Sequence, residues 1–347
     1  MNSPVVDPAC TLMFQEASQA PEAVRTQLER NAPAVASLAA QLRAARPRAV
    51  VTCARGSSDH AATYAKYLFE TRVGVITASA APSIASVYGA RQDLRDCLFL
   101  AISQSGQSPD LLASAQAARE QGARVVALVN DESSPLAVLA DQALPLCAGE
   151  EKSVAATKSY IASLAGIAQL AAEWADDGDM REALARIPAD LARAWALDWS
   201  EGLDWLRNAS HLYVIARGVG LGVAQEAALK CKETCGLHAE SFSAAEVRHG
   251  PQALLHGNFP AMLFAQDDET REGIESLAAD LVARGIDVML AGAQVQGAVS
   301  LPTAQCHPTL QPLAIAQSFY RFANALAIAR GCDPDRPPHL RKITETT

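Results

Sequence analysis

Two short polar turns carry residues whose types and spacing point to ligand chemistry. AISQSGQSPD begins at Ala101 and follows the apolar run CLFL, which is typical of a buried strand. RGSSDH, at residues 55–60, also follows an apolar run and leads into a helical pattern. Serine hydroxyls, a glutamine amide and free backbone N–H groups at such a junction can hold a phosphate without a lysine or arginine in the loop. An ordinary polar turn would show the same local pattern.

The end of the first turn predicts the start of a helix. Ser108 suits the N-cap, Pro109 the first helical position and Asp110 the positive end of the helix dipole. Gly106 allows the backbone to turn or to approach a ligand closely. Ligands of open α/β sheets bind at the carboxyl ends of strands. Two hydroxyl-rich turns in one sheet therefore favour a phosphorylated small polyol over a nucleotide, for which the Walker and dinucleotide motifs are incomplete.

Strand and helix patterns alternate around these turns. Strands are expected at 49–54, 74–80, 97–103, 124–130, 142–148, 211–217, 261–267 and 287–293, and helices at 10–46, 60–72, 109–121, 155–177, 223–236 and 311–330, with a helical connection over 180–209. This alternation predicts parallel sheets flanked by helices. The segments that begin at Val50 and Leu212 both run strand, Ala-Arg-Gly, short loop, helix. One unit used twice is the simplest interpretation, and coincidence between two turns is the alternative.

Composition narrows the function classes. The 347 residues suggest two domains, and with 50% hydrophobic and 19% charged residues the chain can fill a sizeable core. A net charge of −9 argues against a nucleic-acid binder. The most apolar stretch, 160–174, is too short to span a bilayer, and the start lacks a signal-peptide pattern, so we expect a cytoplasmic protein with no membrane partner. Cys231 and Cys235 could share a metal, but no further ligand lies at zinc-site spacing, and we expect no metal or other cofactor.

Six segments, in chain order, indicate a family. They are CARGSSDHAATY, AISQSGQSPD, SVAATKSY, EAALKCKE, HAESFSAAEVRHGP and LRKIT. With them the chain resembles the sugar-isomerase (SIS) domain proteins from about residue 30 to the C-terminus, and more narrowly the isomerase half of glucosamine-6-phosphate synthase. The resemblance implies two SIS domains, each a parallel sheet in a three-layer, flavodoxin-like α/β arrangement, and a homodimer. The boundaries expected are a helical segment at 1–35, SIS domains at 36–178 and 206–330, a helical linker at 179–205, and a tail at 331–347 that closes the active site.

Departures from the synthase pattern favour a smaller group of enzymes within the SIS family. Residue 2 is asparagine and no glutaminase domain precedes the repeat, while AGEEKSVAATKSY and ARGSSDHA are similar to segments of the SIS-type glucosamine-6-phosphate deaminases. Ala156 stands where the synthase has serine, which implies a different environment for the amine. The reaction implied is conversion of glucosamine 6-phosphate to fructose 6-phosphate and ammonia.

The resemblance also assigns roles to residues. It places the sugar phosphate on Ser103, Gln104, Ser105 and Ser108, a further ligand contact on Ser58, and the backbone of Val154 and Ala155 near the C2 substituent. Glu233 would move the proton between C1 and C2, a task that suits a carboxylate whose pKa is raised by partial burial. Lys230 lies one helical turn earlier on the same face and would tune Glu233 or hold a sugar oxygen. A surface Lys–Glu pair would show the same spacing.

Two further residues would act on the open-chain sugar. His249, in RHGP, would open the pyranose ring, because the reference pKa of histidine lies near ~6.5. In the family this histidine comes from the partner subunit, so the active site would be shared across the dimer, and Glu246 could orient it. Lys342, in LRKIT, matches a lysine that forms a Schiff base with the keto sugar or closes over it. A histidine packed at a turn and a solvated terminal lysine are the alternatives.

Several readings stay open at this level. The chain could be an isomerase subunit of a glutamine–fructose-6-phosphate aminotransferase, served by a separate glutaminase. It could be a deglycase for a fructosamine 6-phosphate, or a non-catalytic sugar-phosphate sensor. The sequence does not distinguish glucosamine from galactosamine.

Overall fold

The structure, a computed structural model, describes residues 7–342 and divides into two compact units. The first-sheet unit comprises residues 22–150, 159–186 and 341–342, and the second-sheet unit comprises 7–21, 151–158 and 187–340. Residues 1–6 of the expected N-terminal segment and 343–347 of the expected tail lie outside the described residues. The predicted domain boundaries stay predictions, and each unit is described by itself.

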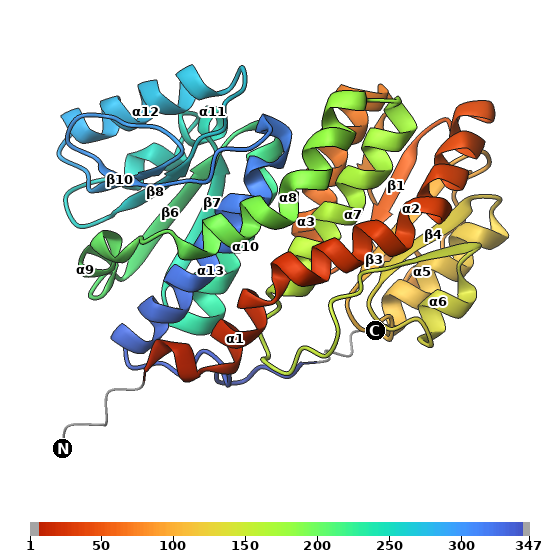
Figure 1. The fold of residues 1–347 in the computed structure, drawn as a ribbon, viewed down its shortest axis with the longest axis horizontal. Coiled ribbons are helices and arrows are strands. Elements are labelled where there is room, and N and C mark those ends of the chain that lie inside the picture. Colours follow the sequence, from red (N-terminus) through yellow and green to blue (C-terminus); the bar gives the residue numbers. More distant parts are fainter. Residues whose placement is uncertain (1–6, 343–347) are drawn as a thin grey trace. The chain divides into compact units, whose positions relative to one another are not determined.

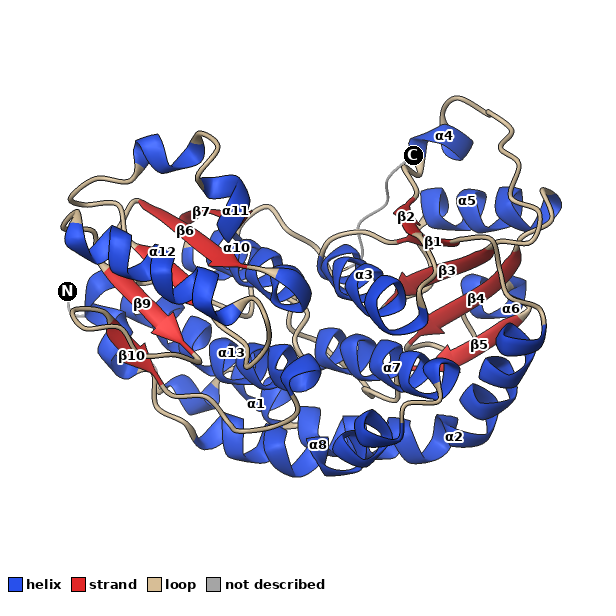
Figure 2. Ribbon diagram, turned by 90° about the horizontal axis from the view of Figure 1, so that it is seen from above, coloured by secondary structure: helices blue, strands red, loops and turns tan. Residues whose placement is uncertain are grey.

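The first-sheet unit is built on a five-stranded parallel sheet. Its strands are β1 (Val50–Cys53), β2 (Thr77–Ser79), β3 (Leu98–Ser103), β4 (Arg124–Val129) and β5 (Gln142–Pro145), in the order β2-β1-β3-β4-β5. Its helices are α2 (Ala20–Ala44), α3 (Ser57–Leu68) with a π-helical turn (Phe69–Val73), α4 (Ser83–Ser86), α5 (Pro109–Glu120), α6 (Pro135–Leu139), α7 (Lys158–Ala175) and the first half of α8 (Gly178–Ala196). Helices α5 and α6 cover one face of the sheet, and α3 and α7 cover the other (Figure 2).

The second-sheet unit repeats this plan. Its strands are β6 (His211–Ala216), β7 (His238–Ser243), β8 (Ala261–Phe264), β9 (Val288–Ala291) and β10 (Val299–Leu301), all in parallel pairs in the order β10-β9-β8-β6-β7. Its helices are α1 (Leu12–Ser18), α9 (Leu203–Leu206), α10 (Leu221–Cys235), α11 (Ala244–Val247), α12 (Arg271–Ala283) and α13 (Gln311–Ala329) (Figure 1). Its 3-10 turns are Pro8–Cys10, Ser200–Gly202, Gly218–Gly220, Pro251–Leu254 and Pro308–Leu310. Counted along the chain, both sheets have the flavodoxin-like order 2-1-3-4-5, which confirms the predicted fold.

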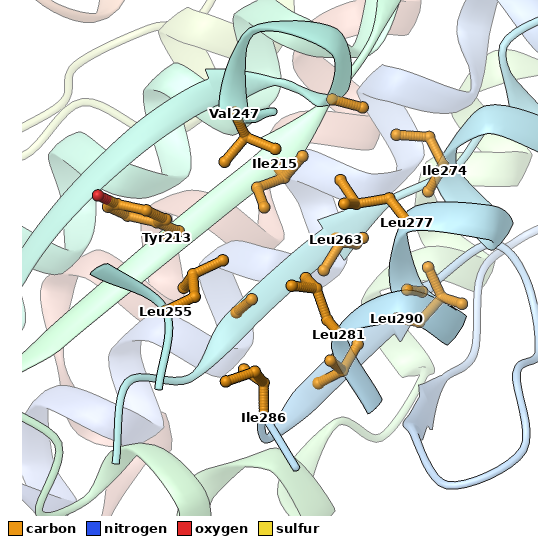
Figure 3. Close-up of a cluster of buried hydrophobic side chains, with 14 of the residues drawn as sticks. Tyr213, Ile215, Val247, Leu255, Leu263, Ile274, Leu277, Leu281, Ile286 and Leu290 are labelled. Carbon is orange, nitrogen blue, oxygen red and sulfur yellow. The ribbon is translucent and has the colours of Figure 1, made fainter. Parts of the chain in front are cut away.

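Strands buried on both faces explain the apolar runs in the sequence. Every residue of β3, LFLAIS, is buried, as parallel sheets covered by helices on both faces require. In the second-sheet unit, Tyr213, Leu263 and Leu290 of the sheet pack with Val247 of α11 and Leu277 of α12 in one apolar cluster (Figure 3). Such clusters hold the strands in place, and in the first-sheet unit the SQSGQS turn begins at the end of β3.

The differences from the predicted elements have local causes. β7 was missed because HAESFS is mostly polar, with His238 and Glu240 exposed, as suits an edge strand, and β10 because it has only three residues. α12 was also missed. The predicted helix 10–46 is interrupted at Gln19, which ends α1. No helix of the described residues is long and apolar enough to cross a membrane.

Candidate active site

The two polar turns lie at the topological switch point of the first sheet. Strands β1 and β3 are neighbours, and the helices that follow them, α3 and α5, lie on opposite faces (Figure 2). Ligands of open α/β sheets bind in the crevice that this reversal leaves. The Arg55 guanidinium donates to the fully buried Asp110 carboxylate at 2.7 Å, so an ion pair joins the two turns. Sequence reasoning placed Asp110 at the helix start but missed its partner Arg55.

Two serines of the SQSGQS turn accept hydrogen bonds from backbone N–H groups of the same turn. Ser103 is the last residue of β3, and its Oγ accepts the Gly106 N–H at 3.0 Å. Ser105 Oγ accepts the Gln107 N–H at 3.3 Å. Each hydroxyl that accepts one bond keeps its own hydrogen to donate. Gln104 and Ser105 are half-buried, so the turn offers donors along an open edge.

Ser108 departs from one expectation. It occupies the N-cap of α5 with extended backbone, as predicted, but its side chain makes no capping hydrogen bond. The prediction that this hydroxyl caps the helix is therefore wrong, and the hydroxyl can donate to a ligand instead. Ser58 is half-buried in the first turn of α3. The structure thus places Ser58 and the SQSGQS serines at the same edge of the sheet, after adjacent strands.

Gly106 fits the turn as no other residue would. Its φ is +63°, and a Cβ added there would lie 2.2 Å from the Ser134 Oγ. Ser134 cannot move away freely, because it caps α6 by accepting the Ala137 N–H at 3.3 Å. A side chain at 106 would therefore meet both backbone strain and a fixed neighbour.

We expect Gly106→Ala to lower the free energy of unfolding by about 2–5 kcal/mol, from left-handed backbone strain and overpacking together. The matched control is Gly149→Ala, since Gly149 has a φ of +66° but nothing within 4 Å of an added Cβ. Gly149→Ala should cost only the strain, about 1–2 kcal/mol. Urea unfolding measures both changes, and equal losses in the two variants would contradict the packing described for Gly106.

Carboxylates hold the segment that contains Val154 and Ala155 in the second-sheet unit. The buried Glu16 accepts the backbone N–H groups of Lys152 and Ser153, the latter at 3.1 Å. The Val154 N–H donates to the Asp335 carbonyl at 3.5 Å. Asp335 also accepts two backbone N–H groups at the start of α1 through its carboxylate. This scaffold joins distant parts of the chain, and no sequence pattern predicts it.

The predicted Lys230–Glu233 pair is part of a buried cluster on α10. Lys230, 1% exposed, donates to Glu233 and lies 3.5 Å from the Glu226 carboxylate. Burial alone lowers the pKa of Lys230, but the Glu226 and Glu233 carboxylates outweigh it, and the pKa is raised. One ammonium thus faces two carboxylates. This arrangement differs from a surface pair, the alternative reading of the spacing.

Only one carboxylate of this cluster is accessible. The Glu226 side chain is 1% exposed, whereas that of Glu233 is 22% exposed. The Tyr320 hydroxyl of α13 donates to Glu226 Oε1 at 3.0 Å. Glu226 could have been found from its spacing of four residues to Lys230. Tyr320 could not, because it lies 94 residues away in the sequence.

The paired cysteines of α10 behave as core residues. Cys231 and Cys235 are buried, and burial raises the pKa of both thiols, that of Cys235 to about 12. A metal would require the thiolate form. Within residues 7–342, no group of three or more His, Cys, Asp or Glu side chains is arranged to hold a metal ion.

His249 and Lys342 lie apart from these groups in the chain. His249 is exposed on the turn after α11, and its backbone N–H donates to the Glu246 carbonyl at 2.9 Å. Arg248 beside it bonds to Asp280 of α12 at 3.0 Å, which anchors the turn. Lys342 is half-buried at the end of the described residues. The roles of both residues stay predictions.

Each unit therefore brings together its own set of candidates. The first-sheet unit carries the phosphate-turn residues, namely Ser58, Ser103, Gln104, Ser105 and Ser108, together with Lys342. The second-sheet unit carries Val154, Ala155, Lys230, Glu233 and His249.

The architecture defines a doubly wound α/β protein with a duplicated sheet. The family model for the SIS domain matches residues 42–173 and 205–292, and the chain belongs to this family. Among curated relatives, glutamine–fructose-6-phosphate aminotransferase [isomerizing] of Pyrobaculum aerophilum is 34% identical over 95% of this chain and 56% of its own length. The corresponding enzyme of Thermococcus kodakarensis is 30% identical over 95% and 57%. The chain thus spans about half the length of the curated relatives it matches.

Solved structures give the same relationship. A candidate phosphosugar isomerase of Silicibacter pomeroyi DSS-3 has a TM-score of 0.90 and 43% identity, covering 94% of this chain and 100% of that one. The C-terminal domain of glucosamine-fructose-6-phosphate aminotransferase from Francisella tularensis has a TM-score of 0.85 and 25% identity, covering 94% and 98%. Glucosamine-6-phosphate deaminase of Thermotoga maritima, at 22% identity and a TM-score of 0.78, shares the fold.

Proposed function

We propose that this chain is an amino-sugar-phosphate isomerase that deaminates glucosamine 6-phosphate to fructose 6-phosphate and ammonia. The observation that carries the proposal is the α10 cluster, in which a buried ammonium faces two carboxylates and only Glu233 is accessible. Moving a proton between neighbouring carbons needs one group that can take it and return it. A single accessible carboxylate beside a fixed cation meets that requirement.

The phosphoryl end of the sugar would be held by the first sheet. The hydroxyls of Ser105 and Ser108, the Gln104 amide and the first turn of α5 supply donors at one strand end. Asp110 is already paired with Arg55, which offsets its charge at this anion site. The absence of a lysine or arginine from the SQSGQS turn itself makes this a neutral-donor site. Val154 and Ala155 would face the C2 substituent, as the resemblance implies.

The chemistry needs no external oxidant. His249 moves a proton from O1 to O5 and opens the ring, which exposes the C1 aldehyde. Glu233 removes the proton at C2 and returns it at C1, while O1 gains a proton and the C2 nitrogen loses one. C1 is thereby reduced and C2 oxidised, giving an alcohol at C1 and an imine at C2. Water adds to the imine, and ammonia leaves as the C2 ketone forms. Lys342 would close over the open-chain sugar.

A second candidate is supported by the curated relatives, which are named as isomerising aminotransferases. The chain would then run the same steps in the opposite direction, adding ammonia to fructose 6-phosphate. Because a catalyst accelerates both directions, the two candidates differ in the source of ammonia and not in the α10 cluster.

The test is release of ammonia and fructose 6-phosphate from glucosamine 6-phosphate, with galactosamine 6-phosphate beside it and the reverse reaction in ammonium chloride. Turnover of glucosamine 6-phosphate in the absence of any second protein supports the deaminase. Synthesis that requires an added glutaminase and glutamine, with no deamination, supports the aminotransferase subunit. Failure to turn over or bind either sugar would contradict both.

The proposal that two subunits of a homodimer share each active site can be tested separately. If His249 acts in the partner's site, Glu233→Gln and His249→Ala should each be inactive alone, while the mixed protein regains activity. Random exchange in a two-fold dimer leaves one intact site in half of the molecules, so about a quarter of wild-type activity is expected. Activity is measured after unfolding and joint refolding, with each variant refolded alone as the control. No recovery in verified heterodimers would show that both residues act in one subunit.

A further inference from the structure

The second-sheet unit contains a cavity that none of the candidate site residues lines. Its volume is about 750 Å³, within the range of small-molecule sites. It lies at the amino ends of the strands, since His211 begins β6, His238 begins β7 and Asp287 directly precedes β9. No residue of α10, all of which the structure describes, lines it. The cavity is therefore distinct from the Lys230–Glu233 cluster.

The register between β6 and β7 determines which side chains form the floor of the cavity. His211 pairs with His238, and Tyr213 pairs with Glu240, across β6 and β7. Alternate residues of a strand share a face, so these four side chains form one patch on the same side of the sheet. The two imidazoles lie 5.7 Å apart, edge to face. Burial and, secondarily, the Glu240 carboxylate raise the pKa of Tyr213.

An aromatic stack supports this floor. The Phe259 ring stacks on His211, with ring centroids 5.3 Å apart, and lies edge to face with Tyr213 at 4.7 Å. Phe259 is buried, and Tyr213 belongs to the apolar cluster beneath α11 and α12 (Figure 3). The aromatic rings are therefore held in place by the core, while Glu240 and Asp287 stand exposed around them.

The fixed charges at this cavity are negative. Its lining residues include the carboxylates of Glu240 and Asp287 and the imidazoles of His211, His238 and His256, but no lysine or arginine. Aromatic faces attract cations through their quadrupoles, and nearby carboxylates add to that attraction. We infer that this cavity binds a small organic cation, a protonated amine on a flat, apolar body.

The experiment titrates benzylamine hydrochloride and benzyl alcohol, which share shape but not charge, into the full chain by calorimetry. We expect the amine to bind roughly tenfold tighter than the alcohol, and Glu240→Gln to weaken the amine roughly fivefold or more, from the cation–π and ionic contributions. Glu269→Gln, an exposed carboxylate elsewhere in the same unit, is the matched control and should leave amine binding unchanged.

Two further measurements separate this site from the proposed active site. Saturating fructose 6-phosphate should not displace benzylamine, and Glu240→Gln should retain full ammonia release from glucosamine 6-phosphate. Displacement by fructose 6-phosphate, equal binding of alcohol and amine, or undiminished amine binding in Glu240→Gln would each overturn the inference. Because amine binding is read directly, a chain without deaminase activity would leave this test intact.

Discussion

Glu233→Gln is expected to lower the turnover number for glucosamine 6-phosphate by roughly 10²–10⁴-fold, the usual contribution of a general acid–base group. Glutamine keeps the size of the side chain and can still accept a hydrogen bond from Lys230, but it cannot take a proton from C2 and return it to C1. The KM should change little, because the phosphoryl contacts assigned to the SQSGQS turn are untouched. Steady-state ammonia release measures both constants.

The control for this variant is Glu269→Gln, which removes an exposed carboxylate far from α10 in the sequence. It should keep wild-type constants. A second readout separates chemistry from folding: Glu233→Gln should bind fructose 6-phosphate as the wild type does, by calorimetry. Unchanged turnover in Glu233→Gln would remove this residue from the mechanism, and lost sugar binding would mean that the variant acts on structure.

Local chemistry explains why the turns could be predicted from the sequence. Ser108-Pro109-Asp110 specifies a helix start by itself, and the apolar run before it specifies a buried strand, so the strand–turn–helix unit was read correctly. Alternation predicted parallel sheets flanked by helices, and the flavodoxin-like arrangement was implied by the family resemblance. Even there, the capping bond of Ser108 did not form, because an N-cap position does not determine where the hydroxyl points.

Long-range partners could not be predicted in the same way. Arg55 and Asp110 are 55 residues apart, and Glu226 and Tyr320 are 94 apart. Neither pair leaves a periodic trace in the sequence, because each depends on how separate elements pack. The edge strand β7 was hidden for a related reason: its outward side carries His238 and Glu240, which look like loop residues until the register with β6 is known.

Lys230→Met is expected to lower the free energy of unfolding by about 3–5 kcal/mol, the usual cost of leaving a buried charge without its partner. The Glu226 side chain is 1% exposed, so water cannot replace the ammonium. The Tyr320 hydroxyl still donates to the Glu226 carboxylate, but it carries no charge to offset that of the carboxylate. The matched control is Lys232→Met on the same helix, which alters an exposed lysine and should change stability by no more than about 0.5 kcal/mol.

Removing the charge of Glu226 as well should restore much of the free energy of unfolding that Lys230→Met loses. In the double variant Lys230→Met/Glu226→Gln, the glutamine carbonyl can still accept the Tyr320 hydroxyl, and the remaining carboxylate of the cluster, that of Glu233, is 22% exposed and can be hydrated. Replacing a whole buried ion pair by neutral groups is often nearly neutral for stability, so we expect the double variant to unfold within about 1–2 kcal/mol of the wild type. Urea unfolding of the wild type, the single variants Lys230→Met and Glu226→Gln, and the double variant measures this coupling. Two results would contradict this account: Lys230→Met losing no more stability than Lys232→Met, or the double variant being less stable than Lys230→Met. In either case the α10 cluster would not be the buried network that positions Glu233. The acid–base assignment would then lose its structural support.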